Sequence, residues 1–196
     1  MQVAIVKYNA GNIQSVIHAL NRLGVNCLLT DKEEELNSAD KVIFPGVGEA
    51  STTMKYLKEQ NLDIIIKNLK QPVLGICLGQ QLLCSHSEEG NTDCLGIFDA
   101  PVLRFRPTRH EDKVPHIGWN TIYDYKSELY KGFDKPDYVY FVHSFYVPVC
   151  DWTIASTEYI VPFSASLHKD NFYSAQFHPE KSGDTGELIL KNFLNI

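Results

Sequence analysis

One strand-to-helix segment in the middle of the chain constrains the fold more than any other. Residues 72–85 read PVLGICLGQQLLCS. The apolar residues before Cys77 are typical of a buried parallel strand, and the leucines four apart after it are typical of a helix. Gly75 and Gly79 suit a sharp turn between the two, because side chains there would collide where the backbone doubles back. The segment predicts a cysteine at the carboxyl end of a strand and the amino end of a helix.

The predicted position of Cys77 favours a reactive sulfur. Free N–H groups and the helix dipole stabilise a thiolate, which is the form of cysteine that attacks carbonyl carbons. The N–H of Leu78, directly after Cys77, is then a candidate donor to an oxyanion. A buried cysteine after an apolar strand is also a common packing residue, so the turn leaves a structural interpretation open.

Length and composition indicate an ordinary globular protein. The chain has 196 residues, the size of one ample domain, and we expect residues 1–196 to form a single domain. A net charge of −6 disfavours non-specific binding to nucleic acid or a membrane. The first residues lack a basic flank and a cleavage site, so we expect a cytoplasmic protein. Five cysteines without Cys-x-x-Cys spacing argue against a disulfide framework and a zinc site.

The order of the expected elements predicts an α/β fold with a mostly parallel central sheet flanked by helices. In the first half, the expected strands cover residues 2–8, 25–30, 41–44 and 73–76, and the expected helices cover 12–23, 49–69 with a break near Asn61, and 78–85. The second half adds expected strands at 101–106, 117–125, 138–147, 153–157, 163–168 and 172–177, a turn at 169–171, and a closing helix at 185–194. These later strands lack long helices between them, so we expect additional antiparallel pairing there.

Residues 176–180, which read QFHPE, supply a candidate base and its orienting group. Pro179 favours an extended conformation at His178, and residues two apart in extended chain point the same way, so Glu180 can reach the imidazole. A carboxylate on one ring nitrogen leaves the other free to take a proton from a thiol. With Cys77, this predicts a Cys-His-Glu triad, although His-Pro-Glu is also compatible with a plain strand end.

A glycine-flanked loop follows the strand expected at 41–44. Residues 45–48 read PGVG and precede a helix, so the N–H of Val47 can turn toward an anion beside the thiol. The Gly-Lys-Ser/Thr ending of a phosphate-binding loop is missing.

Taken together, these motifs resemble the class I, triad-type glutamine amidotransferases. The segments VPHIGWN at 114–120, YFVHS at 140–144 and HPEKSG at 178–183 are further similar to the glutaminase subunits of two-chain imidazole glycerol phosphate synthases, which belong to histidine biosynthesis. The likeness extends from residues 8–12 to the final helix. The chain departs from the usual pattern at 8–10, where the family is richer in glycine, at Gln80, where methionine is usual, and at Phe145, where tyrosine is common.

The resemblance implies a reaction and a set of site residues. Cys77 would attack the side-chain amide of L-glutamine, His178 would protonate the leaving ammonia and then activate water, and Glu180 would hold His178. The N–H groups of Leu78 and Val47 would stabilise the tetrahedral oxyanion. The family uses no cofactor or metal here, and the positions that would hold glutamine are Gly48, Gln81, Glu89, His143, Ser144 and Phe145.

The resemblance also implies a partner. Similar subunits form a heterodimer with a (β/α)8 cyclase, which receives ammonia through an internal passage and uses it to make imidazole glycerol phosphate. The matching contact positions are Asn12, Trp119, Tyr140 and Lys181. A tryptophan between Gly118 and Asn120 is equally compatible with a core position.

Three alternatives remain open from the sequence. The same glutaminase chemistry also feeds a paralogous barrel used in the amidination of bacterial surface sugars. A second alternative is a non-catalytic scaffold, which the intact triad residues disfavour. A third is a stand-alone γ-glutamyl peptidase, which the short second half and the segment around Trp119 disfavour.

Overall fold

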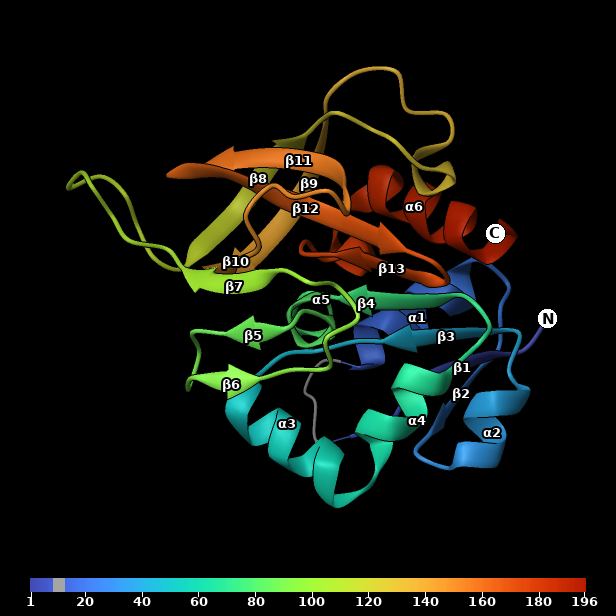
Figure 1. Cartoon of the computed structure of the whole chain (residues 1–196). Coiled ribbons are helices and arrows are strands. Elements are labelled where there is room, and N and C mark those ends of the chain that lie inside the picture. Colours follow the sequence, from blue (N-terminus) through green and yellow to red (C-terminus); the bar gives the residue numbers. More distant parts are fainter. Residues whose placement is uncertain (9–12) are drawn as a thin grey trace.

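A computed structural model of the chain describes residues 1–8 and 13–196 (Figure 1). Within these residues, the largest sheet has seven strands in the order β11-β12-β13-β4-β3-β1-β2. The neighbours β13, β4, β3, β1 and β2 pair in parallel, and β12 and β11 extend the sheet with antiparallel pairing. The bounds are β1 (Val3–Val6), β2 (Cys27–Thr30), β3 (Lys41–Phe44), β4 (Val73–Ile76), β11 (Thr153–Tyr159), β12 (Val161–Lys169) and β13 (Phe172–Ala175).

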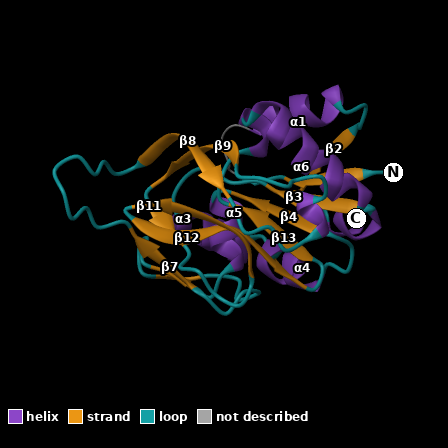
Figure 2. Ribbon diagram, turned by 90° about the horizontal axis from the view of Figure 1, so that it is seen from above, coloured by secondary structure: helices purple, strands orange, loops and turns teal. Residues whose placement is uncertain are grey.

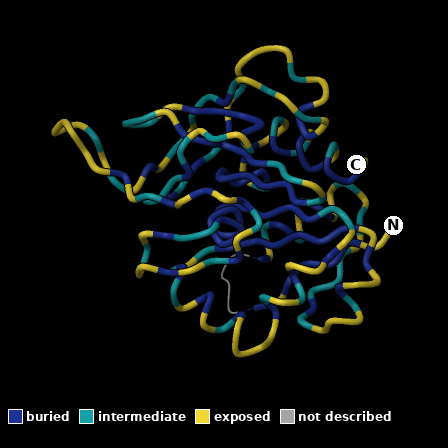
Figure 3. Tube along the Cα trace, viewed as in Figure 1, coloured by how far each residue is buried: buried dark blue, intermediate teal, exposed yellow. Residues whose placement is uncertain are grey.

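Helices cover both faces of this sheet, because its parallel strands are buried on both sides (Figure 2). Val3 and Ile5 of β1 pack in one core with α1 (Ile13–Arg22) and α6 (Gly183–Asn195). Ala4 and Val6 pack in the other core, with α2 (Glu33–Ser38), α3 (Ala50–Glu59), α4 (Leu62–Asn68) and α5 (Leu78–Leu83). The buried trace in Figure 3 follows these strands through the centre of the molecule. Among the described residues, no helix combines the length and the apolar character that crossing a bilayer requires.

The mostly parallel α/β fold is confirmed, and several local predictions are confirmed with it. The strand expected at 41–44 has those bounds, and the helix expected at 49–69 breaks at Asn61, whose φ of 56° lies in the left-handed region. The strand expected at 138–147 is wrong in one respect, because Ser144 separates β9 (Asp137–His143) from β10 (Phe145–Tyr146). Helix α2 and the two-residue strands β5 (His86–Ser87) and β6 (Thr92–Asp93) were not predicted, because they are too short to show a clear periodicity.

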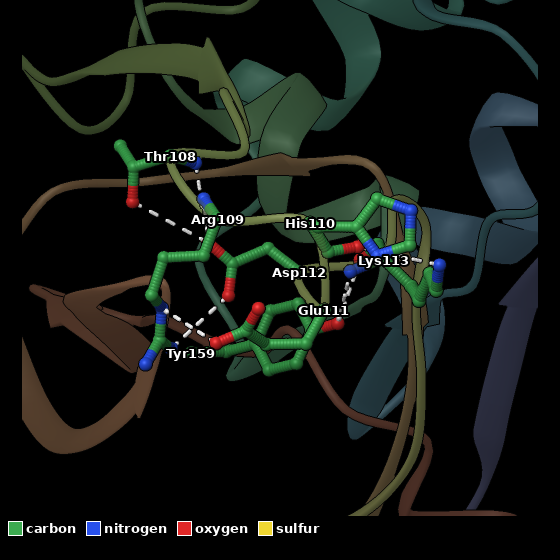
Figure 4. A network of polar contacts seen from close by, with 7 residues as sticks. All are labelled: Thr108, Arg109, His110, Glu111, Asp112, Lys113 and Tyr159. Atoms are coloured by element: carbon green, nitrogen blue, oxygen red, sulfur yellow. Dashed lines mark hydrogen bonds and ion pairs between the residues drawn. The ribbon is translucent and has the colours of Figure 1, made fainter.

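Two smaller sheets contain the remaining strands of the described residues. One has the order β10-β7-β5-β6, with β7 at Pro101–Arg104, and the other pairs β8 (His116–Ile122) with β9. Between β7 and β8 an exposed loop projects from the body of the molecule (Figures 1 and 3). Figure 4 shows how it is held: Asp112 accepts hydrogen bonds from the backbone of Thr108 and Arg109, and Tyr159 donates one to the carbonyl of Lys113. The loop therefore carries His116 and Pro115 back to the sheet in a fixed direction.

Candidate active site

Cys77 occupies the turn between β4 and α5, as predicted. Its φ of 54° lies in the left-handed region, and its N–H donates to the carbonyl of Ala175 at 2.7 Å. Both flanking glycines are sterically required, Gly75 by the turn itself, as predicted, and Gly79 by the close approach of β3. A Cβ added at Gly79 would lie 2.0 Å from the Phe44 carbonyl oxygen, and one at Gly75 would lie 2.7 Å from Leu83 Cδ1. The turn is compact because both positions lack side chains.

His178 and Glu180 form a buried pair, called here the charged pair. His178 Nδ1 lies 2.8 Å from Glu180 Oε1, and both side chains are 2% exposed. The backbone of His178 is extended, as predicted, and its N–H donates to Tyr140. The expectation of extended chain through Glu180 is wrong, because Pro179–Lys181 forms one turn of 3₁₀ helix, η2. The carboxylate reaches the ring from that turn because the helix begins directly after His178.

The electrostatics of His178 follow from its two neighbours. Burial alone lowers the pKa of a histidine, but here the interactions with Cys77 and Glu180 outweigh it and raise the pKa of His178 to about 10. The Nε2 atom of His178 is buried and makes no well-aligned hydrogen bond to any described residue. The second ring nitrogen is therefore available on the side of the sulfur, while Glu180 holds the first.

A pocket of about 310 Å³ opens at the carboxyl ends of the parallel strands. It brings together ten residues singled out from the sequence, namely Val47, Gly48, Cys77, Leu78, Gln81, Glu89, His143, Ser144, Phe145 and His178. Pro115 and Val142 complete the lining and were not predicted, because their apolar side chains carry no chemical signal of a binding site. The pocket thus places the predicted nucleophile and base beside every residue expected to hold glutamine.

Glu89 is half-buried in the lining of the pocket. Its carboxylate accepts a hydrogen bond of 2.7 Å from the N–H of Ala50, the first residue of α3. Burial raises the pKa of Glu89, and the Ala50 N–H opposes that shift. The carboxylate is held in place by the start of a helix, where negative charge is stabilised.

The loop at 45–48 packs against the start of α5, directly after Cys77. The N–H of Leu78, expected to be free for an oxyanion, instead donates to the carbonyl of Gly46 at 3.3 Å in this structure. The hydroxyl of buried Tyr8 donates to the carbonyl of Pro45. Tyr8 was missed as a site residue, because its role depends on β1 and β3 being neighbours in the sheet. The loop is therefore anchored at both of its first two carbonyls.

A second set of polar groups surrounds the pocket and is called here the neutral network. It comprises His116, His143, the Phe145 carbonyl, Gln81 and Gln176. Burial lowers the pKa of His143 to about 3 and that of His116 to about 4. Both rings are therefore neutral near pH 7. His116 and Gln176 were not predicted as site residues, because their partners come from distant parts of the chain.

The residues predicted to contact a partner lie outside the pocket. Trp119 is 56% exposed, which excludes the core position left open by the sequence, and its ring meets Tyr140 edge to face at 6.0 Å. Ile117 and Tyr138 are exposed on the same face of the β8–β9 ribbon. Lys181 is exposed too, whereas Asn12 lies outside the described residues. This apolar face adjoins the charged pair through the bond from His178 N–H to Tyr140.

Comparison with known proteins gives one consistent result. The family model described as glutamine amidotransferase class-I matches residues 4–196. The chain is 67% identical over 196 residues to the imidazole glycerol phosphate synthase subunit HisH of Bacteroides thetaiotaomicron, with 100% of both chains covered. It is 47% identical over 202 residues to the HisH subunit of Idiomarina loihiensis, with 100% of this chain and 98% of that relative covered.

The solved structures agree at the level of the fold. A structure described as a glutamine amidotransferase has a TM-score of 0.75 at 18% identity, covering 98% of this chain and 97% of that chain. The structure of PurLQS from Thermotoga maritima has a TM-score of 0.71 at 15% identity, covering 99% of this chain and 97% of that chain.

Proposed function

Because the chain belongs to the class I glutamine amidotransferase family, we propose that Cys77, His178 and Glu180 are its catalytic triad. It acts as a glutamine amidotransferase subunit of imidazole glycerol phosphate synthase in histidine biosynthesis. The observation that carries the triad is the buried charged pair: His178 Nε2 has no well-aligned hydrogen-bond partner among the described residues, and Cys77 and Glu180 together raise the pKa of His178. We further propose that residues 1–196 form one glutaminase domain and that the protein works in the cytoplasm.

The chemistry follows from this arrangement. The Cys77 thiolate attacks the carboxamide carbon of glutamine, and the carbonyl electron pair moves onto oxygen. The His178 imidazolium, whose high pKa keeps it charged at neutral pH, gives its Nε2 proton to the leaving nitrogen. Ammonia departs and a thioester remains. Neutral His178 then takes a proton from water, whose oxygen forms the new bond to carbon, and glutamate leaves as the carbon–sulfur bond breaks.

Substrate binding is assigned to the pocket lining. Glu89 is the partner for the α-ammonium group, because its carboxylate is fixed by Ala50 and faces the cavity. The backbone around Ser144 is the partner for the α-carboxylate. Gly48, Gln81, His143 and Phe145 complete the lining around the glutamine side chain.

The oxyanion donors are the N–H groups of Leu78 and Val47. In this structure the Gly46 carbonyl occupies the Leu78 N–H, so the loop at 45–48 has to reorient before both donors face the substrate. We expect low activity of the isolated chain and stimulation when a partner holding its own ligand drives that reorientation. High, ligand-independent activity of the isolated chain would contradict this coupling.

A variant of the nucleophile tests the triad. Cys77→Ala removes the sulfur, and we expect glutamate release to become undetectable while partner binding persists. Cys27→Ser serves as the matched control, because Cys27 is a partly exposed cysteine on β2. Measurable hydrolysis by Cys77→Ala would overturn the assignment.

The exposed face of the β8–β9 ribbon is the proposed docking surface for a (β/α)8 cyclase subunit. Large exposed aromatic side chains such as Trp119 are typical anchors of protein interfaces. Trp119→Ala should weaken the heterodimer by about 2 kcal/mol, or roughly thirtyfold in Kd. Ile64→Ala on α4 is the control, because Ile64 has the same exposed fraction of 56%. Equal losses in titration calorimetry for both variants would exclude this surface.

A further inference from the structure

We propose that Gln176 is a catalytic residue that stabilises the Cys77 thiolate, with an amide N–H aimed at the sulfur by the neutral network. This inference rests on the proposed role of Cys77 as the nucleophile. Gln176 follows β13 directly, as Cys77 follows β4, and the two strands are parallel neighbours with Ala175 opposite Ile76. The side chain of Gln176 is fully buried, and its Nε2 lies 3.7 Å from Cys77 Sγ.

The direction of the amide is fixed by a backbone carbonyl. The oxygen of Phe145 can only accept, and Gln81 Nε2 lies 3.2 Å from it. Gln81 must therefore present its nitrogen on this side, since its own oxygen would face another acceptor. Gln81 Nε2 also lies 3.0 Å from Gln176 Oε1, and its second N–H donates to that oxygen. The other end of the Gln176 amide, which faces the sulfur, is then the N–H end.

His143 also bonds to the Phe145 carbonyl, and His116 in turn bonds to His143. His143 Nδ1 lies 2.7 Å from the Phe145 oxygen, so this nitrogen carries the proton. Its Nε2 is then an acceptor, and His116 Nδ1 donates to it at 3.2 Å. Each donor and acceptor between His116 and Gln176 is therefore assigned in only one way. The remaining N–H of this network, on Gln176 Nε2, points at Cys77 Sγ.

A backbone carbonyl near the sulfur acts against ionisation, so a hydrogen-bond donor to the sulfur is needed to offset it. The carbonyl of Val142 lies 3.9 Å from Cys77 Sγ, where it can accept a proton from the thiol but repels a thiolate. The amide N–H of Gln176 has the opposite effect and favours the thiolate, since hydrogen bonds to charged groups are about twice as strong as those between neutral groups. Gln176 thus supports the ionised sulfur together with His178.

The test measures the reactivity of Cys77 without turnover. Iodoacetamide alkylation of the full chain is followed by tandem mass spectrometry at Cys77 from pH 5 to 10. Gln176→Met should slow alkylation at pH 7 about tenfold and move the midpoint of the rate profile up by about one pH unit, with the rate at pH 10 restored. Gln176→Glu, nearly isosteric, should slow it further, because a carboxylate oxygen then faces the sulfur.

Gln80→Met is the matched control. Gln80, on the helix α5 that follows Cys77, is as buried as Gln176 and is hydrogen-bonded to the Ser164 carbonyl and to Ser174, but it makes no bond to Cys77 Sγ. We expect its alkylation profile to match that of the unaltered chain. Profiles of both Gln176 variants that coincide with that of Gln80→Met would overturn the proposal. A failed triad would show itself separately, as glutamine hydrolysis that survives in Cys77→Ala.

Discussion

The charged pair and the neutral network surround the same sulfur, and both contain a buried histidine. Burial lowers the pKa of a histidine in both places, but the outcomes are opposite, about 10 for His178 and about 3 for His143. The difference lies in the groups around each ring: Cys77 and Glu180 both raise the pKa of His178, whereas no acidic group faces His143 among the described residues. The partner of Nδ1 shows the contrast. For His178 it is a carboxylate at 2.8 Å, whereas for His143 it is a backbone carbonyl at 2.7 Å.

The contrast gives the two histidines of the pocket, His178 and His143, different chemical roles. A carboxylate stabilises imidazolium by its full charge, so His178 can give a proton to a leaving group. A carbonyl directs a proton without supplying a full charge, so His143 stays neutral and fixes hydrogen-bond directions instead. Partner chemistry, more than depth of burial, decides the role of each ring.

The largest effect is expected when the carboxylate of the charged pair is replaced by a neutral amide, as in the neutral network. Glu180→Gln keeps the shape of the side chain but removes one of the two groups that raise the pKa of His178, and with it the carboxylate that orients the ring. We expect kcat for glutamate release to fall about a thousandfold or more, as expected when the orienting carboxylate of a triad is neutralised. Steady-state rates with and without the partner measure the effect.

The control for that variant is Glu187→Gln on α6, an exposed carboxylate 3.9 Å from Lys191. It should leave kcat unchanged. If Glu180→Gln retained more than about a tenth of the activity, Glu180 would not be the orienting group of a triad.

The second test concerns the neutral network and the pH dependence of stability. The folded-state pKa of His116 is lowered to about 4 from 6.5, so between these values the unfolded chain binds a proton that the folded chain does not. Stability therefore falls as the pH falls through this window. His116→Gln should remove about 2 kcal/mol of the loss in unfolding free energy between pH 7.5 and pH 5.

Urea unfolding at the two pH values measures this difference and cancels the packing that the variant loses at both. His18→Gln, on the exposed side of α1, should keep the acid sensitivity of the unaltered chain. The charged pair contributes to the pH dependence of stability with the opposite sign, because the pKa of His178 is raised in the folded state. Its stabilisation is present in full below about pH 6.5 and is lost as the pH rises through the folded-state pKa of about 10. Acid sensitivity unchanged in His116→Gln would show that His116 is not held neutral.

The sequence predicted the charged pair well, because its information is local. His178 and Glu180 are two residues apart with a proline between them, and the turn around Cys77 is marked by two glycines. Gly79 is needed because the turn approaches the Phe44 carbonyl of β3, whereas the steric need for Gly75 is local, because a Cβ there would meet Leu83 and the backbone of Gly79 in the same turn. Most of the parallel sheet was predictable for the same reason, since each strand is a short apolar run.

The neutral network could not be predicted in this way, because it is assembled from four distant segments. Gln81 and Gln176 are 95 residues apart, and His116 and His143 are 27 apart. Their bonds depend on β13 entering the sheet beside β4 and on β8 pairing with β9. A buried glutamine carries no periodic signal, so only the packed structure shows which of its two ends faces the sulfur.

The third and smallest expected effect comes from a residue that belongs to neither set. Tyr8 holds the Pro45 carbonyl, at the start of the loop whose Gly46 carbonyl occupies the Leu78 N–H. Tyr8→Phe removes one buried hydrogen bond, so the loop should leave this conformation more easily. We expect basal glutaminase activity of the isolated chain to rise about fivefold, which corresponds to about 1 kcal/mol.

The shape of the pH profile should not change in Tyr8→Phe, because no bond of the charged pair or of the neutral network is altered. Tyr125→Phe is the matched control, since its hydroxyl also donates to a backbone carbonyl, that of Ile122 at 2.7 Å. It should leave the basal rate unchanged. A basal rate in Tyr8→Phe that stays equal or falls would mean that the Tyr8 bond supports the active loop conformation, and the reorientation assigned to residues 45–48 would then have to begin elsewhere.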